Sequence, residues 1–193
     1  MELIENPHII LASLSPRRKE LMNKYFKNVK IVSLNTEEKT LKTKPEEIVM
    51  DLARQKMGNL NEEYLDDVVV SADTIVYFNG KVYGKPHTNE VAYKFLKELE
   101  SNTHSVYTGV CVSYKGHVEI FYEKSLVKFN QMSDDEIKKY ILECKPLDKA
   151  GAYGIQDKQV VKSYDGDYDN IVGLPIKRLV KVIKDMEKEY EEC

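Results

Sequence analysis

The sequence lacks the features that define several common classes of protein. Its three cysteines, Cys111, Cys144 and Cys193, are far apart, and no Cys-x-x-Cys pair occurs. This spacing offers neither a disulfide framework nor a zinc knuckle, and it fits a reducing cytosol. No stretch approaches the apolar length of a membrane span, and no basic start is followed by an apolar run. We therefore expect a cytoplasmic protein with no signal peptide and no membrane partner.

Two familiar nucleotide-binding signatures are also missing. The chain contains neither Gly-x-x-x-x-Gly-Lys-Ser/Thr nor Gly-x-Gly-x-x-Gly. The formal net charge is −3 and the basic residues are not gathered in one block, which argues against a nucleic-acid partner. A small anionic substrate is compatible with this charge, because a local pocket can be positive on a mildly acidic protein.

The pattern that is present indicates helices interleaved with strands. At 193 residues, the chain is long enough for one domain with a real core, and we expect a single domain over 1–193. Helices are predicted over 15–25, 46–57, 89–99, 133–143 and 175–191, and strands over 8–12, 29–33, 68–78, 82–83, 104–114 and 118–129. Turns at 79–80 and 115–116 predict hairpins, and a third hairpin is predicted over 160–172. This mixture predicts an α/β fold with a mixed, curved sheet flanked by helices, and two lobes around a cleft.

The segment 11–19 places two arginines at the start of a predicted helix. Ser15 is a favourable N-cap residue and Pro16 a favourable first helical residue. Arg17 and Arg18 each lie one turn before an apolar residue, so both point with the apolar stripe. Inward arginines need an anion, and a helix N-terminus is suited to phosphate. The alternative is an ordinary helix start with two solvated arginines.

A carboxylate interrupts the apolar strand predicted over 68–78. Asp73 has apolar residues on both sides, and a buried carboxylate must meet a cation, a metal or several donors. It is therefore a candidate general base or a ligand for a hard metal ion. The alternative is that the strand breaks at 71–73 and that Asp73 caps a turn.

Two lysines are further candidates for binding an anion. Lys56 falls on the apolar face of the helix predicted over 46–57. Its amine either snorkels out at the helix end or meets an anion in a cleft. Lys85 stands between a glycine and a proline, which stiffen the loop beneath a cation, although a surface turn would have the same sequence.

The segment 148–156 combines two glycines and two alanines with a tyrosine and Gln156. Small residues allow a ligand to approach closely, and the Gln156 amide carries the donor and the acceptor needed to read a base edge. A bulged strand without a ligand is the alternative. His104 has no Cys or His partner at ligand spacing, so we interpret it as structural. Ser13 and Ser15 have no evident His/Asp partners, which argues against a nucleophilic triad.

Together these groups fit one site for a polyphosphate. Four inward cations would hold the phosphates, and one inward carboxylate would bind a divalent metal or activate a water. The cations are Arg17, Arg18, Lys56 and Lys85, and the carboxylate is Asp73. These are the requirements for cleaving a phosphoanhydride.

The motifs that hold these residues resemble those of the Maf family of nucleoside triphosphate pyrophosphatases, which share a fold with the inosine triphosphate pyrophosphatases. Six motifs carry the resemblance, in order, along nearly the whole chain. They are Leu-Ala-Ser-Leu-Ser-Pro-Arg-Arg at 11–18, Ala-Arg-Gln-Lys at 53–56, Ser-Ala-Asp-Thr-Ile-Val at 71–76, Gly-Lys-Pro at 84–86, Pro-Leu-Asp-Lys-Ala-Gly-Ala-Tyr-Gly-Ile-Gln at 146–156 and Asn-Ile-Val-Gly-Leu-Pro at 170–175.

The resemblance implies hydrolysis of a nucleoside triphosphate to the monophosphate and pyrophosphate, with Mg²⁺ or Mn²⁺. Asp73 matches the family's proton acceptor, and Glu38 matches its acidic residue on the metal side. The loop before Glu37 is one residue longer than usual, so Glu37 stays an alternative to Glu38. The family's phosphate site matches Ser13, Arg18, Lys56 and Lys85, and the helix at Ser15 would add backbone donors.

Three positions differ between the subfamilies that this chain resembles. Arg17, Thr74 and Gln156 look like the members that act on dTTP and UTP, whereas members that act on 7-methyl-GTP tend to have Trp, Gln and Glu there. Asp157 stands where the family usually has Gly, and this extra carboxylate could alter base preference. Met57 stands where Ala is usual.

The resemblance therefore predicts a dTTP and UTP pyrophosphatase that removes unwanted nucleotides from the pool. The family is also associated with arrest of cell division, and a homodimer is expected from the family alone. Two alternatives stay open, namely a non-catalytic regulator of cell division and the same reaction on 7-methyl-GTP or modified pyrimidine nucleotides.

Overall fold

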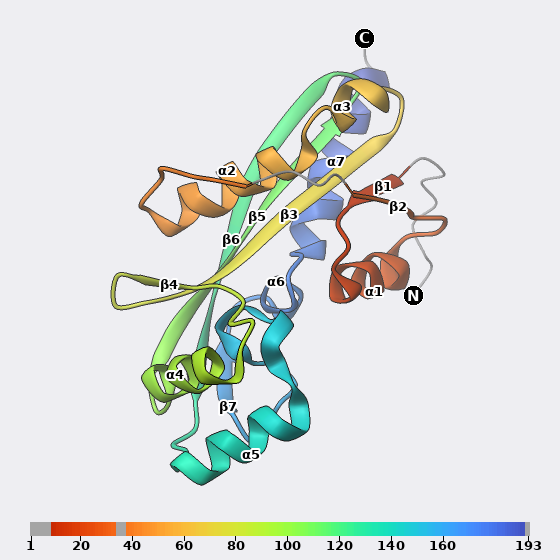
Figure 1. Ribbon diagram of the computed structural model, residues 1–193. Coiled ribbons are helices and arrows are strands. Elements are labelled where there is room, and N and C mark those ends of the chain that lie inside the picture. The colour runs from red at the N-terminus through yellow and green to blue at the C-terminus, as the bar shows by residue number, and fades with distance from the viewer. Residues whose placement is uncertain (1–8, 34–37, 192–193) are drawn as a thin grey trace.

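A computed structural model describes residues 9–33 and 38–191 (Figure 1). Within these residues, seven strands form one sheet in the order β2-β1-β3-β5-β6-β7, and β4 pairs with β3. The strands are β1 (Ile9–Ala12), β2 (Lys30–Val32), β3 (Val68–Phe78), β4 (Lys81–Tyr83), β5 (Thr103–Tyr114), β6 (His117–Phe129) and β7 (Val161–Asp165). The α-helices are α1 (Pro16–Tyr25), α2 (Pro45–Met57), α3 (Leu60–Glu63), α4 (Asn89–Leu99), α5 (Asp134–Cys144), α6 (Tyr168–Val172) and α7 (Ile176–Glu191), with 3-10 turns η1 (Pro146–Asp148) and η2 (Ala150–Ala152).

The sheet is mixed, as the sequence predicts. Strand β1 pairs in parallel with both β2 and β3, whereas the other neighbouring strands are antiparallel. Figure 1 shows β3, β5 and β6 as long, twisted strands that run through the whole molecule. Helices α1, α2 and α7 lie around one end of these strands, and α4 and α5 lie at the other end. The α/β fold with two lobes is therefore confirmed.

Each lobe has its own hydrophobic core, and the long strands contribute to both. The core of the first lobe includes Ala72 and Val110 with residues of α1 and α7. The core of the second lobe includes Val76 and Val106 with residues of α4 and α5. Burial of apolar side chains is the main stabilising contribution in a domain of this size. The middle of β3, between Ala72 and Val76, thus lies where the two cores meet.

Local signals placed most elements correctly. Strand β3 and helix α4 have the predicted bounds, and α5 begins with a complete capping box. In that box Ser133 N donates to Glu136 Oε2 at 2.7 Å, and Glu136 N donates to Ser133 Oγ at 3.3 Å. No helix of the described residues is both long and apolar enough to span a membrane.

The hairpin predicted over 160–172 is wrong. Strand β7 is followed by helix α6 and not by a second strand. The reason is a strong helix start, because Asp167 Oδ1 accepts hydrogen bonds from Asp169 N and Asn170 N at 2.8 and 3.3 Å. Segment 148–156 also differs from the bulged-strand alternative, since it forms 3-10 turns in which Gly151 has φ of 68°. Helix α3 was not predicted.

Candidate active site

The candidate site lies along a bare edge of β3. On that edge β1 pairs with 68–70 and β4 pairs with 76–78, so no strand of the described residues pairs with 71–75. The strand is continuous through Asp73, which excludes the alternative of a break there. Side chains alternate between the two faces of a strand, so Asp73 meets α2 and Thr74 meets α1. Both side chains reach one cleft around the bare edge.

Asp73 is 9% exposed and forms an ion pair with Lys56 of α2. The Lys56 Nζ atom also lies 3.2 Å from Glu38 Oε2, so two carboxylates converge on one amine. The Lys56 amine therefore does not snorkel into solvent but turns into the cleft. Glu37, the alternative to Glu38, lies outside the described residues.

Helix α2 can carry Lys56 to Asp73 because the sheet has a glycine at this point. Gly109 of β5 pairs in register with Asp73. A Cβ atom at Gly109 would lie 2.3 Å from the main-chain carbonyl atoms of Val49, far inside van der Waals contact. The missing side chain thus lets the backbone of α2 pack directly on the sheet beside Asp73.

Arg18 is the most buried of the candidate cations and makes an ordered set of hydrogen bonds. Its Nε donates to Gly173 O at 2.7 Å, and its Nη2 donates to Thr74 Oγ1 at 2.9 Å. The Thr108 hydroxyl donates to Asn170 O at 3.0 Å, so Thr74 is the donor in the 2.9 Å contact with Thr108. Burial, only partly offset by Asp73, lowers the pKa of Arg18.

Arg17 points into the same cleft but binds the opposite side of it. Its Nη1 donates to Asp148 Oδ2 at 2.7 Å, and its Nη2 donates to Asp148 O at 3.1 Å. Lys149 contacts the other oxygen of the Asp148 carboxylate at 3.0 Å. Neither arginine is the solvated residue of the alternative interpretation.

Lys85 reaches the cleft from the loop after β4. Its amine makes no hydrogen bond or ion pair with any described residue, although Arg17, Lys56 and Arg18 lie close enough to influence it. Partial burial, followed by the positive charges of Lys56 and Arg18, lowers the pKa of Lys85. The Asp148 carboxylate lies near enough to oppose this shift in part, but it does not pair with the Lys85 amine. An unpaired amine among mainly positive neighbours is suited to an anionic ligand.

The start of α1 contributes backbone donors and serines. Ser15 occupies the N-cap position, as predicted, although its side chain makes no capping hydrogen bond. Instead Ser13 Oγ accepts from Ser15 N at 3.2 Å and from Arg18 Nη1 at 3.4 Å. Pro16, the first helical residue, has no N–H, and the Lys19 amide is the first to bond within the helix, to Ser15 O at 3.0 Å. The amides of Arg17 and Arg18, two residues that line the cleft, are thus left without helical partners.

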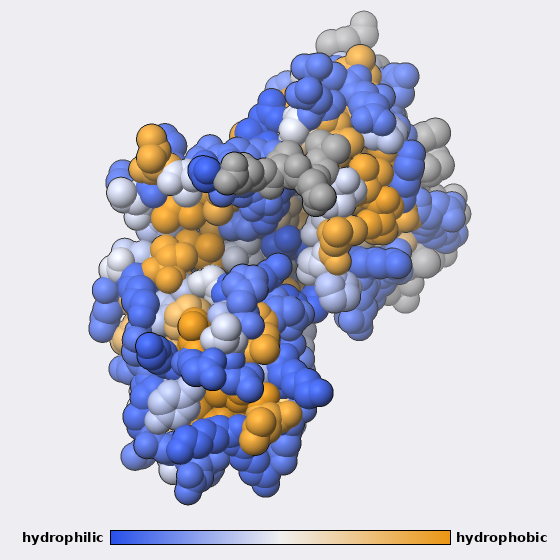
Figure 2. All heavy atoms as spheres, in the orientation of Figure 1, coloured by the Kyte–Doolittle hydropathy of each residue, from blue (hydrophilic) through white to orange (hydrophobic). Residues whose placement is uncertain are grey.

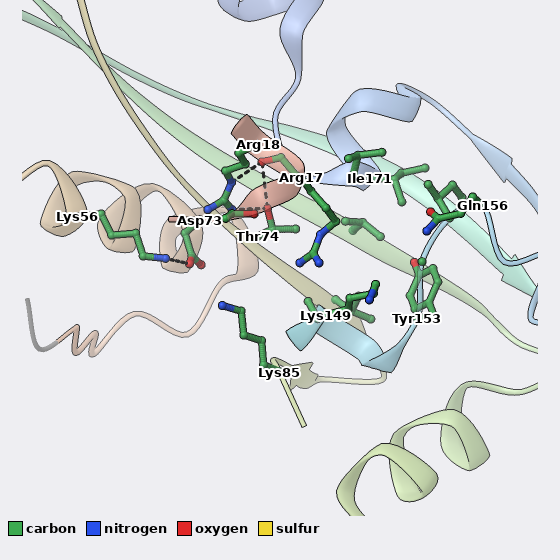
Figure 3. Close-up of a pocket in the computed structure, with 18 residues that line it drawn as sticks. Arg17, Arg18, Lys56, Asp73, Thr74, Lys85, Lys149, Tyr153, Gln156 and Ile171 are labelled. Atoms are coloured by element: carbon green, nitrogen blue, oxygen red, sulfur yellow. Dashed lines mark hydrogen bonds and ion pairs between the residues drawn. The ribbon is translucent and has the colours of Figure 1, made fainter. Parts of the chain in front are cut away.

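The cleft consists of two connected hollows that share five lining residues. Ser15, Arg17, Arg18, Lys56 and Lys85 line both hollows. One hollow continues to the polar residues Ser13, Ser33, Glu38 and Asp148. The other continues to Tyr153 and Gln156 and is walled by the apolar residues Val76, Val106, Ile155, Ile171 and Val172. Figure 2 shows hydrophilic residues in the hollow between the lobes. Figure 3 shows Lys56, Asp73 and Lys85 at one end of the second hollow, with Lys149 on the side toward Tyr153. A ligand with an anionic tail and a flat, less polar head matches this division.

All the described site residues predicted from the sequence therefore line the cleft or bind a residue that does. The sequence did not single out Lys149 or Tyr153, although both stand in a quoted motif. It also missed Thr108 and the Gly173 carbonyl, which hold Thr74 and Arg18. No sequence pattern announces a main-chain acceptor, so Gly173 could be found only in the fold.

Comparison with known proteins assigns the chain to a family. The profile of the Maf-like protein family matches residues 8–186. The chain belongs to the Maf family. A protein of Thermosipho melanesiensis, named dTTP/UTP pyrophosphatase, is 45% identical over 179 residues, which is 92% of this chain and 97% of that protein. A protein of Bacillus cereus with the same name is 44% identical over 179 residues, 91% of this chain and 94% of its own.

Solved structures give a more distant likeness. The Ham1 protein of Staphylococcus aureus aligns with 63% of this Maf chain and 71% of its own, with 13% identity and a TM-score of 0.45. A nucleoside-triphosphatase, named dITP/XTP pyrophosphatase, of Mycobacterium abscessus aligns with 64% and 75%, with 12% identity and a TM-score of 0.38.

Proposed function

We propose that this Maf protein hydrolyses dTTP and UTP to the monophosphate and pyrophosphate, as one domain over 1–193. The observation that carries the proposal is the convergence of Arg17, Arg18, Lys56 and Lys85 around the buried Asp73 carboxylate in one cleft. The names of the relatives from Thermosipho melanesiensis and Bacillus cereus support the choice of nucleotides. Removal of unwanted nucleotides from the pool is the proposed cellular role.

The triphosphate binds at the charged end of the cleft in this proposal. Arg18 and Lys85 neutralise phosphate oxygens. Lys56 gives up one of its two carboxylate partners and binds a phosphate oxygen in its place. The Ser13 hydroxyl and the main-chain amides of Arg17 and Arg18 add uncharged donors, as helix N-termini do for phosphates. Since the Lys85 amine forms no ion pair with any of the described residues, although Asp148 is near, binding a phosphate breaks no existing ion pair there.

A divalent cation, Mg²⁺ or Mn²⁺, is proposed to bind between Asp73 and Glu38. No group of three or more His, Cys, Asp or Glu side chains is assembled within the described part of the chain. However, both carboxylates already converge on the Lys56 amine, and Mg²⁺ at nucleotide sites commonly takes one or two carboxylates, with waters and phosphates completing the shell. The donor set therefore fits. When bound, such an ion polarises phosphoryl oxygens and lowers the pKa of bound water.

Asp73 serves as the general base. It accepts a proton from a water whose oxygen bonds to the α-phosphorus, while the bond from that phosphorus to the bridging oxygen of the β-phosphate breaks. Pyrophosphate leaves with its added charge balanced by Arg18 and Lys85. Proton transfer of this kind contributes about 100- to 10,000-fold to rate.

The pyrimidine base of the nucleotide is proposed to occupy the apolar end of the cleft. Gln156 offers a donor and an acceptor there, while Thr74 and Arg17 border the junction with the phosphates. The family's link to arrest of cell division motivates one rival function, a regulator without catalysis. Hydrolysis of 7-methyl-GTP or modified pyrimidines is the other, and a homodimer is a further proposal that rests on the family alone.

The test is a substrate panel with pyrophosphate detection, using dTTP, UTP, CTP, GTP and 7-methyl-GTP. We expect preference for dTTP and UTP, and loss of turnover with EDTA that Mg²⁺ or Mn²⁺ restores. Asp73→Asn should lower kcat by at least about 100-fold without changing the melting temperature by more than a few degrees. Asp135→Asn, on an exposed position of α5, is the matched control.

Preference for 7-methyl-GTP would overturn the assignment of Arg17, Thr74 and Gln156. If Asp73→Asn kept the turnover of the parent protein, the proposed base would be wrong. If it lost turnover but kept an effect on cell division, that effect would belong to a non-catalytic function.

A further inference from the structure

The turn that carries Gln156 is held by its neighbour, Asp157. Gln156 is exposed at the apolar end of the cleft, and its amide makes no hydrogen bond to a described residue. Figure 3 shows it beside Tyr153, at the end of the cleft away from Asp73. An exposed amide that reads a base must be held by the backbone beneath it, because ordering a free side chain opposes binding.

Asp157 uses its side chain and both main-chain polar groups to fix this turn. Its Oδ2 accepts from the Tyr140 hydroxyl of α5 at 2.6 Å and from Gly154 N at 2.9 Å. Its own N–H donates to Gly154 O at 3.0 Å. Its carbonyl accepts from Val160 N at 2.8 Å, at the entrance to β7. The turn over 154–157 is thus closed on itself and tied to the second lobe.

The position of the Gln156 amide depends on this closed turn. A Cβ atom at Gly154 would lie 2.6 Å from Gln156 Nε2 and 2.9 Å from Asp157 Oδ2. The amide of Gln156 and the carboxylate of Asp157 therefore both pack against the main chain of Gly154, which has no side chain to keep them away. Any opening of the turn moves the two groups together.

The Asp157 carboxylate is not a free charge that faces the apolar end of the cleft, where the nucleotide base is proposed to bind. One of its oxygens already takes two donors, and Asp157 does not line either hollow. Its effect on base preference must therefore act through Gln156 and not through direct repulsion or contact.

We propose that Asp157, with Tyr140, is a positioning residue for base selectivity that holds the Gln156 amide in the orientation that reads the base. This inference rests on the proposed function. In this inference, the hydrogen-bonded turn over 154–157 makes the Gln156 side of the cleft selective. The cations at the phosphate end are held by α1, α2 and the loop after β4, and not by this turn. The turn therefore affects base discrimination and KM but not the rate of the chemical step.

The experiment compares Asp157→Gly, Asp157→Asn and Tyr140→Phe with the parent protein, measuring kcat and KM for UTP, dTTP, CTP and GTP. Asp157→Gly removes the acceptor, Asp157→Asn keeps an oxygen that can accept from Gly154, and Tyr140→Phe removes only the hydroxyl. Lys158→Gly is the matched control, since it adds the same backbone freedom one residue later without removing a carboxylate.

We expect Asp157→Gly to raise KM for UTP by about tenfold and to reduce preference over CTP and GTP by a similar factor. Its kcat for UTP should stay within about threefold. Asp157→Asn should recover most of the selectivity, Tyr140→Phe should show a smaller loss in the same direction, and Lys158→Gly should match the parent protein.

Unchanged selectivity in both Asp157→Gly and Tyr140→Phe would overturn the inference. An equal loss of kcat for all nucleotides with a lowered melting temperature would overturn it as well, because that pattern marks a purely structural residue. If Asp157→Gly does not fold, Tyr140→Phe decides alone. Failure of the parent protein to hydrolyse any nucleotide would instead refute the proposed function.

Discussion

Arg17 spans the cleft to Asp148, donating hydrogen bonds of 2.7 and 3.1 Å to its carboxylate and its main-chain carbonyl. This contact joins α1 of the first lobe to η1 of the second. Two parallel contacts fix a guanidinium in one plane better than one contact does. Asp148 therefore fixes the direction in which the Arg17 guanidinium points within the cleft.

Replacement of Asp148 by alanine should weaken substrate binding more than folding. The pair is partly exposed, so the free energy of unfolding should fall by less than about 1 kcal/mol. The KM for UTP should rise about three- to tenfold, because Arg17 loses its orientation. Steady-state kinetics and urea denaturation measure the two effects. Asp66→Ala, at an exposed position, is the control, and a lowered KM in Asp148→Ala would mean that Asp148 competes with substrate.

Thr74→Val should damage both stability and binding, although it preserves shape. Without the hydroxyl, Arg18 Nη2 loses its 2.9 Å acceptor and Thr108 loses its donor. Leaving a buried guanidinium donor unpaired should lower the free energy of unfolding by about 1–3 kcal/mol and raise KM. Thr74→Ser keeps the hydroxyl and should stay close to the parent protein in both measurements. Equal behaviour of Val and Ser variants would show that the hydroxyl chain is unimportant.

The free energy of unfolding should fall as the pH drops from about 6.5 to about 4, partly because of His104. Burial lowers the pKa of His104 from 6.5 to about 4, and its Nε2 lies 2.9 Å from the Tyr153 hydroxyl. The unfolded chain therefore takes up a proton in this window before the folded protein does, which favours unfolding by up to about 3 kcal/mol at the acidic end.

His104→Gln should flatten that part of the pH dependence, since glutamine can bond to Tyr153 without taking up a proton. Urea denaturation at several pH values between 4 and 7 measures the slope for each protein. His117→Gln, at an exposed histidine paired with Glu119, is the control and should keep the steeper slope. If the free energy of unfolding had the same pH dependence in His104→Gln and in the parent protein, His104 would not take up a proton on unfolding.

Gly109→Ala should push α2 away from the sheet and displace Lys56 from Asp73. The added methyl would lie 2.3 Å from main-chain atoms of Val49, and backbone cannot move aside as a flexible side chain can. We expect a loss of about 1–3 kcal/mol in the free energy of unfolding and a lowered kcat. Gly84→Ala, where a Cβ meets nothing within 4 Å, should leave the unfolding midpoint unchanged. An unchanged midpoint in Gly109→Ala would mean that the close helix contact is not required.

Local patterns in the sequence identified the charged groups and the elements that carry them. Asp73 stood out because a carboxylate in an apolar strand needs a partner, and Lys56 because it falls on the apolar face of its helix. Such signals depend only on neighbours along the chain. The hairpin predicted over 160–172 failed for the same reason, because Asp167 capped a helix where alternation suggested a strand.

The sequence by itself determined which residues carry charge inward and on which elements they lie, because periodicity and capping are properties of a short stretch of chain. Only the tertiary structure decided how they meet. Asp73 and Thr74 point to opposite faces of β3 and reach one cleft because β1 and β4 leave the edge over 71–75 bare. Arg17 reaches Asp148 across 131 residues of sequence. These relations follow from strand order and close packing at Gly109, which join distant segments and leave no periodic trace in the sequence.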